Sequence, residues 1–125
     1  MAGSATVTEI VHRPVKKIKF AWTSDASGNV NGGAAITTSK NLCGKIIGLA
    51  TVPAAAGSAP SDNYDLTLLD ADGVDVLFGG GADRDTANTE FVQSSSLGAV
   101  VESTLELRVA NAGNAKSGVA YVFIQ

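Results

Sequence analysis

The stretch that most constrains the fold is NYDLTLLDADGVDVLF, residues 63–78, because its side chains alternate with the period of two that is typical of β-strands. Two alternating arms, 64–69 and 74–78, flank the segment Asp-Ala-Asp-Gly. Aspartate accepts hydrogen bonds from nearby backbone N–H groups, and glycine supplies the positive φ that closes a short hairpin. The sequence therefore predicts a β-hairpin here, with Tyr64 and Phe78 at inward positions.

Other segments repeat this pattern of short alternating runs between Gly, Asn, Ser and Asp residues. Residues 15–23 place Ile18, Phe20 and Trp22 on one face, and residues 103–110 direct Leu105, Leu107 and Val109 inward. Residues 119–124 are apolar on both faces, which is typical of a strand that is central in a sheet or covered by another subunit.

No long helical pattern interrupts these runs. We therefore expect an all-β, single-domain β-sandwich or barrel, with a jelly roll or related Greek key as the favoured connectivity. Residues 1–5 are small and polar and are expected to form a flexible N-terminal arm, and residues 6–125 are expected to form the β-sandwich domain.

Composition narrows the classes of partner. Charged residues make up 17% of the 125-residue chain, against roughly 25% in an average domain, and the formal net charge is -3. A basic footprint for nucleic acid is absent, and no run approaches the ~18 apolar residues of a membrane span, so neither partner is expected. Low charge favours a surface partly covered by protein partners, although Ala and Gly on an ordinary loop-rich surface would give similar percentages.

The sequence offers no catalytic motif, so we expect neither an enzyme nor a cofactor. His12 is the single histidine, with no G-x-S-x-G motif to accompany it and too few His or Cys residues for a zinc site. Gly79-Gly80-Gly81 lacks the following Gly-Lys-Ser/Thr of a phosphate-binding loop and is interpreted as a mobile loop. Cys43 is interpreted as a buried, reduced thiol beside an apolar run.

Two charged clusters each allow a structural and a functional interpretation. Asp70, Asp72 and Asp75 match a fragment of a calcium loop, but a tight hairpin favours the same residue types; a structural turn is preferred, with a weak cation site left open. The basic residues Arg13, Lys16, Lys17 and Lys19 could bind an anion, but a solvated strand face is preferred because no aromatic residues accompany them outward.

Carbohydrate binding is a further alternative, since β-sandwich lectins stack sugars on exposed aromatic rings. Most aromatic residues of this chain fall at positions expected to be inward, and residues 89–93 are expected to form a short strand or turn that packs Phe91. Few rings are therefore expected to remain for a sugar-binding platform. The inward set is Phe20, Trp22, Tyr64 and Phe78.

Two segments carry a resemblance to a known group of proteins. YDLTLLDADGVDVLFGGGADR (64–84) and LELRVANAGNAKSGVAYVFI (105–124) are similar to segments of small tailed-phage virion proteins that resemble capsid decoration, or cement, proteins. The N-terminal half matches only in its general β character. The resemblance implies a small jelly-roll or barrel domain on the outside of the virion capsid, which binds the major capsid protein and assembles as a homo-oligomer, a dimer or a trimer.

These observations give an expected function and expected contact residues. We expect a phage capsid decoration protein that binds the outer capsid surface and stabilises the head by bridging capsid subunits. The alternative is a phage tail or spike component, or a carbohydrate-binding β-sandwich module, that recognises host glycan. The expected contacts lie in the N-terminal segment and the last strand: Thr6, Val7, Glu9, Ile10, Val11, Arg13, Tyr121 and Phe123.

Overall fold

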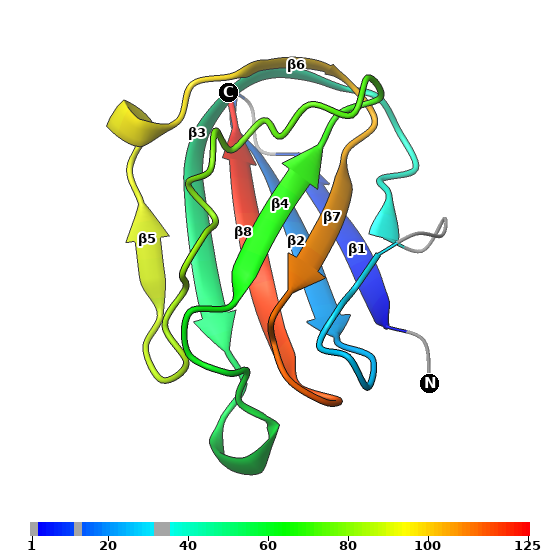
Figure 1. Cartoon of the computed structure of the whole chain (residues 1–125). Helices are drawn as coiled ribbons and strands as arrows, with labels where there is room; N and C mark the ends of the chain where they lie inside the picture. Colours follow the sequence, from blue (N-terminus) through cyan, green and yellow to red (C-terminus); the bar gives the residue numbers. More distant parts are fainter. Residues whose placement is uncertain (1–2, 12–13, 32–35) are drawn as a thin grey trace.

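The protein folds into two packed layers of antiparallel β-structure (Figure 1). The computed structural model describes residues 3–11, 14–31 and 36–125. Within them, the strands are β1 (Ser4–Val11), β2 (Lys16–Thr23), β3 (Leu42–Pro53), β4 (Asp65–Leu69), β5 (Glu90–Val92), β6 (Val100–Ser103), β7 (Glu106–Ala110) and β8 (Ser117–Ile124). Single turns of 3₁₀ helix occur at η2 (Ala56–Ser58) and η3 (Ser94–Ser96). The expected all-β sandwich is confirmed.

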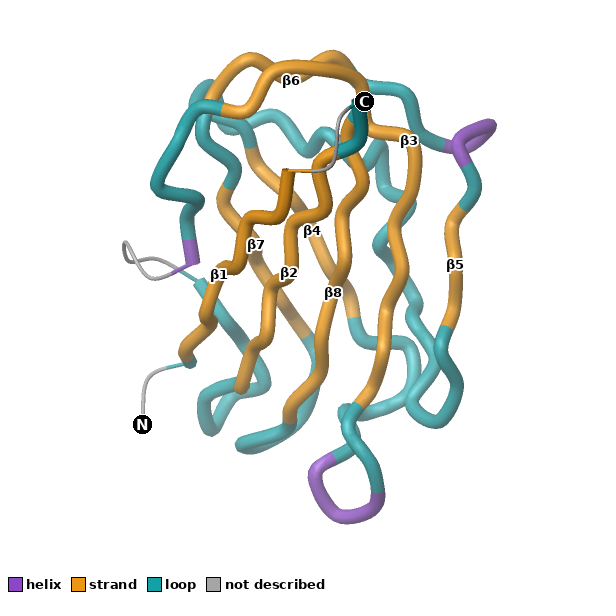
Figure 2. The backbone as a smooth tube through the Cα atoms, turned by 180° about the vertical axis from the view of Figure 1, so that it is seen from behind, coloured by secondary structure: helices purple, strands orange, loops and turns teal. Residues whose placement is uncertain are grey.

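The first layer is a sheet in the order β1-β2-β8-β3-β5, with β6 paired to the other end of β3. The second layer is the β4-β7 pair, to which Val30 and Thr37 add isolated bridges with β7. In Figure 2, β1, β2, β8 and β3 lie in front of β4 and β7. The chain crosses repeatedly between the layers, and its last strand is inserted between β2 and β3. Among the described residues, no helix has the length and hydropathy needed to cross a membrane.

The core lies between the layers and is filled by the inward residues of the alternating strands. Ile18, Phe20 and Trp22 of β2 are all buried, as their spacing predicts. Leu107 and Val109 of β7, with Leu105 just before it, are buried from the opposite layer. Because each strand buries one face, a slip of one residue would expose the whole set, which fixes the register.

A close contact between Trp22 and Gly118 joins β2 to β8. The two residues are register partners, and a Cβ atom at Gly118 would lie 2.7 Å from Cζ2 of the indole. The indole also packs against Tyr64, the residue just before β4, with 5.5 Å between ring centroids. The absence of a side chain at Gly118 therefore creates the space that the Trp22 ring occupies.

The hairpin predicted for residues 63–78 forms only at its turn. Asp70 Oδ1 accepts hydrogen bonds from the N–H groups of Asp72 and Val74, and Leu69 bridges Asp75. Beyond this point the prediction is wrong, because β4 pairs along its length with β7 and residues 76–80 form turns.

The carboxylate of Asp75 explains where the second arm leaves the ladder. Its oxygens accept hydrogen bonds from the backbone N–H groups of Leu68, Leu77 and Gly79, which curls the chain back on itself. Phe78 then adopts a φ of 53° and is 63% exposed, so its predicted inward position is also wrong.

Three further expectations need correction. Ser4 and Ala5, assigned to a flexible arm, are the first residues of β1, and Ala5 is buried; residues 1–2 of that arm lie outside the described residues. Cys43 is exposed, because the period of two that buries Leu42 directs its neighbour outward. Phe91 is 59% exposed, because β5 places it on the outward side of the sheet opposite Ala50.

Candidate interaction surface on the outer sheet face

The side of the first sheet that faces away from β4 and β7 is called the outer face here. Alternate residues of the strands point out from it, and the register aligns them into cross-strand rows. The central row is Thr8, Lys19, Tyr121, Ala50 and Phe91; on either side lie Ile10, Lys17, Phe123 and Gly48, and Thr6, Ala21, Val119 and Val52. Two of these rows contain large apolar side chains that the core does not use.

Aromatic rings from β8 and β5 meet on this face. Phe91 and Phe123 have ring centroids 6.0 Å apart, and Tyr121 lies on the same side of β8 as Phe123. Gly48 lies beneath this pair, where a Cβ atom would be 2.9 Å from Cζ of Phe91. The glycine therefore allows the two phenylalanine rings to approach each other over β3. We call Tyr121, Phe123 and Phe91 the aromatic cluster.

A lysine lies over the aromatic cluster. The Lys17 ammonium is 4.4 Å from the ring centroid of Tyr121 and 6.0 Å from that of Phe123, within the range of a cation–π interaction. In the three rows of the outer face the charged residues are Lys17 and Lys19, and there is no carboxylate. Salt bridges among the described residues occur elsewhere, at Arg84–Glu90 and Arg108–Glu106. The face is thus apolar with a positive charge close to its centre.

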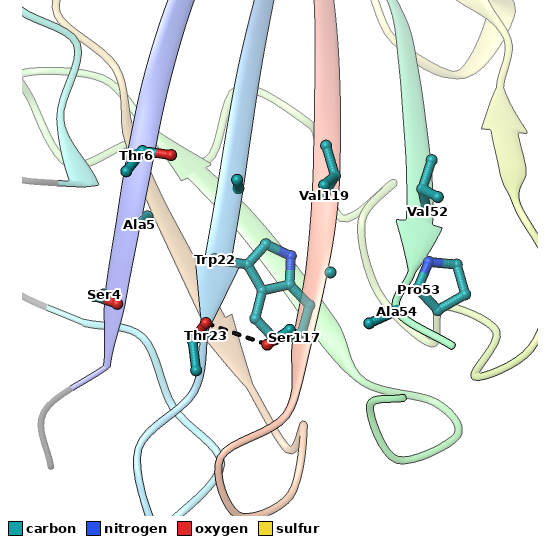
Figure 3. A pocket seen from close by; sticks show the side chains of 12 residues that line it. Ser4, Ala5, Thr6, Trp22, Thr23, Val52, Pro53, Ala54, Ser117 and Val119 are labelled. Carbon is teal, nitrogen blue, oxygen red and sulfur yellow. Dashed lines mark hydrogen bonds between the residues drawn. The ribbon is translucent and has the colours of Figure 1, made fainter. Parts of the chain in front are cut away.

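A hollow of about 510 Å³ lies over the ends of β1, β2, β8 and β3 (Figure 3), and its lining includes the row of Thr6, Ala21, Val119 and Val52. Hydroxyl groups gather in it, and those of Thr23 and Ser117 lie 3.1 Å apart. Small apolar groups such as Ala21 and Val119 form other parts of its wall. None of its lining residues carries an ionisable side chain, so the hollow offers binding contacts without general acid–base chemistry.

The structure divides the residues expected to make contacts. Thr6 and Ile10 of β1 lie on the outer face with Tyr121 and Phe123 of β8. Val7 packs against the core, and Glu9 lies on the inward side beside Ile18, so neither contributes its side chain to the outer face. Val11 is the last residue of β1. Arg13, like His12, lies outside the described residues.

Two features of the face were not recognised in the sequence. Phe91 was expected to pack inward, and its three-residue strand is too short to show a period that would have indicated its direction. Lys17 was interpreted as solvated with no aromatic partner, whereas the pairing of β2 with β8 brings it over Tyr121. The expectation that few aromatic rings remain outside the core is therefore wrong.

The acidic loops are arranged as turns. Besides Asp70 and Asp75, Asp65 accepts hydrogen bonds from the Asp83 N–H and from the Asn111 side chain. The Ala87 N–H and the Asn88 side chain donate to Asp85, which lowers the pKa of that carboxyl below its usual value. Within the described part of the chain, no group of three or more His, Cys, Asp or Glu side chains is placed to hold a metal ion. These contacts support the structural interpretation of the aspartates.

Comparisons of the chain with protein-family models, with curated proteins and with solved structures found no match. The outer face is therefore interpreted from its own geometry and chemistry.

Proposed function

We propose that this chain is a tailed-phage capsid decoration protein, which binds the outside of the capsid and stabilises the head by bridging capsid subunits. The similarity of residues 64–84 and 105–124 to segments of small phage virion proteins suggests the setting. The observation that carries the proposal is the aromatic cluster on the outer face, where Phe91 is 59% exposed.

Such a surface suits a protein that acts by contact. A sheet with one solvated face normally alternates apolar inward and polar outward residues, but Val119, Tyr121 and Phe123 make the outward side of β8 apolar as well. Each 100 Å² of apolar surface that a partner removes from water contributes about 2.5 kcal/mol. These side chains project from strands of the sandwich, whose backbone is already ordered. Binding a partner therefore costs little additional conformational entropy.

Bridging also requires contacts between copies of the protein or with more than one capsid subunit. β1 is the terminal strand in the order β1-β2-β8-β3-β5. Among the described residues, no strand pairs with the edge of β1 that faces away from β2. Edge strands of this kind can add a strand from a second chain. We propose that copies associate as dimers or trimers through this edge while the outer face contacts the major capsid protein.

The test is reconstitution with capsids assembled without the protein. Wild-type protein should co-sediment with these shells and raise the temperature at which they break. Phe91→Ala should weaken binding at least about fivefold, as expected for an aromatic residue central to an interface. Phe78→Ala is the matched control, because Phe78 is equally exposed but lies in the loop after Asp75. Wild-type protein that never binds the shells would overturn the proposal.

Recognition of host glycan is a second candidate, favoured by the combination of exposed rings with a hollow lined by hydroxyl groups. Sugars stack on aromatic faces and exchange hydrogen bonds with hydroxyls. A glycan array separates the two candidates: retention of specific sugars, lost in Tyr121→Ala, would support the receptor-binding role. A decoration protein would leave the array empty.

A further inference from the structure

We infer that the outer face binds an acidic protein surface, whose carboxylates pair with Lys17 and Lys19 while its apolar side chains cover the aromatic cluster. The inference rests on the proposed function, since it specifies the chemistry of the capsid surface that is bound. It follows from the position of the Lys17 charge within the apolar area.

A partner cannot cover the aromatic cluster without also covering Lys17. The ammonium is 4.4 Å from the centre of the Tyr121 ring, and the lysine lies in the same cross-strand row as Phe123 and Ile10. Docking over these rings would remove water from the charge. Burying an ion without a counter-charge is strongly unfavourable, which would offset the gain from the apolar contacts.

A carboxylate on the partner would offset the cost of removing water from the Lys17 charge. It would replace the lost hydration of Lys17 with a charge-assisted hydrogen bond, which is stronger than a hydrogen bond between neutral groups. The chain itself provides no such group nearby, because the described salt bridges involve Arg84 and Arg108 and the three rows of the outer face contain no acid. The acid must therefore come from the partner.

A second copy of this chain does not provide it. Stacking two outer faces would bring the lysines of both copies together and leave them unpaired. The carboxylates of the chain lie outside the three rows. Asp65, Asp70 and Asp75 accept hydrogen bonds from backbone N–H groups in the second layer and its loops, and Glu9 of β1 is on the inward side of the first sheet. The outer face is thus suited to a different surface, rich in Asp or Glu.

Nucleic acid fits the face less well than an acidic protein. Its affinity depends on many phosphate contacts, and this face offers two lysines on a chain of net charge -3. An acidic glycan could pair with the lysines and stack on the rings, and the experiment below separates it from a protein surface.

The experiment measures the affinity of the full chain for undecorated capsids at several salt concentrations. Lys17→Glu/Lys19→Glu should lower the affinity at least about tenfold at 0.1 M ionic strength, where charges act over about 10 Å. The difference should shrink at 1 M, where this range falls to about 3 Å. Lys40→Glu/Lys116→Glu is the matched control, because it makes the same change in net charge at positions outside the rows of the outer face.

A neutral pair of substitutions tests whether the two lysine charges strengthen or weaken capsid binding. Lys17→Met/Lys19→Met keeps much of the apolar stem and removes the charge. If the partner is acidic, this variant should bind capsids more weakly, by about threefold or more, because the partner's carboxylates lose their counter-charges. If the partner surface is uncharged, the variant should bind more tightly, because an unpaired ammonium no longer has to be buried. Tighter or unchanged binding would overturn the inference.

The outcomes separate this inference from the proposed function. Wild-type protein that fails to bind shells at any salt concentration overturns both. Binding that is equal for wild type and Lys17→Glu/Lys19→Glu overturns only the acidic-partner inference. Alginate, used as an acidic polysaccharide, should not displace the protein from shells at matched charge concentration; displacement through direct binding would assign the face to a glycan. Thermal unfolding of each variant shows that the fold is retained.

Discussion

Replacing Gly118 with alanine tests the contact that joins β2 to β8. A Cβ atom there would lie 2.7, 3.0 and 3.2 Å from Cζ2, Cε2 and Nε1 of Trp22. The ring cannot simply move away, because Tyr64 packs on it with 5.5 Å between centroids and Trp22 is only 2% exposed. The substitution therefore overfills a packed site.

Two effects of opposite sign determine the magnitude. Alanine in place of glycine in a strand should stabilise the fold by roughly 0.5–1 kcal/mol through backbone entropy alone. Overpacking a core site costs about 1–3 kcal/mol. Since all three ring atoms lie inside normal contact distance, we expect a net loss of about 1–2 kcal/mol. For a chain of this size that corresponds to a fall in Tm of roughly 4–8 °C.

Urea unfolding followed by circular dichroism measures this loss, and Trp22, the single tryptophan, gives an independent fluorescence signal. Gly57→Ala is the control, because no atom lies within 4 Å of the added Cβ and no positive φ is involved. It should be neutral or slightly stabilising. In a Trp22→Phe background, Gly118→Ala should cost at least about 1 kcal/mol less, since the indole atoms it meets are gone. An equal cost in both backgrounds would refute the explanation.

Two further predictions concern polar groups. Asp75→Ala removes the acceptor for three backbone N–H groups and should destabilise the fold by about 1–3 kcal/mol in urea unfolding, whereas the exposed Asp72→Ala should change it by less than about 0.5 kcal/mol. Burial raises the pKa of Tyr64 above its ordinary value of 10.0, with the Thr51 hydroxyl opposing this effect. The neutral phenol is therefore favoured in the folded state, and its contribution to stability is present below pH 10.0 and lost as the pH rises through the raised pKa. Tyr64→Phe should lose less stability than wild type between neutral and strongly alkaline pH; an equal loss would contradict the assignment.

The sequence predicted the long strands well because their periodicity is local. Residues 16–23 alternate over their whole length with one apolar face, so both the strand and the burial of Ile18, Phe20 and Trp22 could be read from spacing alone. The turn at Asp70 was also predictable, since aspartate and glycine favour it by local hydrogen bonding and backbone freedom.

Strand pairing was not predictable in the same way. The alternation of residues 65–69 is equally compatible with pairing to the next segment or to β7, and the long-range choice depended on how Asp75 binds the backbone around it. The candidate surface shows the same limit. Tyr121 and Phe123 were identified from the doubly apolar last strand, but the position of Lys17 over Tyr121 depends on the register between β2 and β8, which no local pattern encodes.

The outer face is not required by the fold, and this is the strongest physical reason to assign it a role. A two-layer sandwich is held together by the facing sides of its sheets, which here bury Ile18, Val122 and Leu107. Apolar rings on the opposite side add no core contact, and exposed apolar patches promote association. Lys17 limits this risk, because two such faces that approach each other bring together like charges. The same charge is compatible with a partner that carries carboxylates, so under the proposal made above the lysine would both oppose self-stacking and favour an acidic surface.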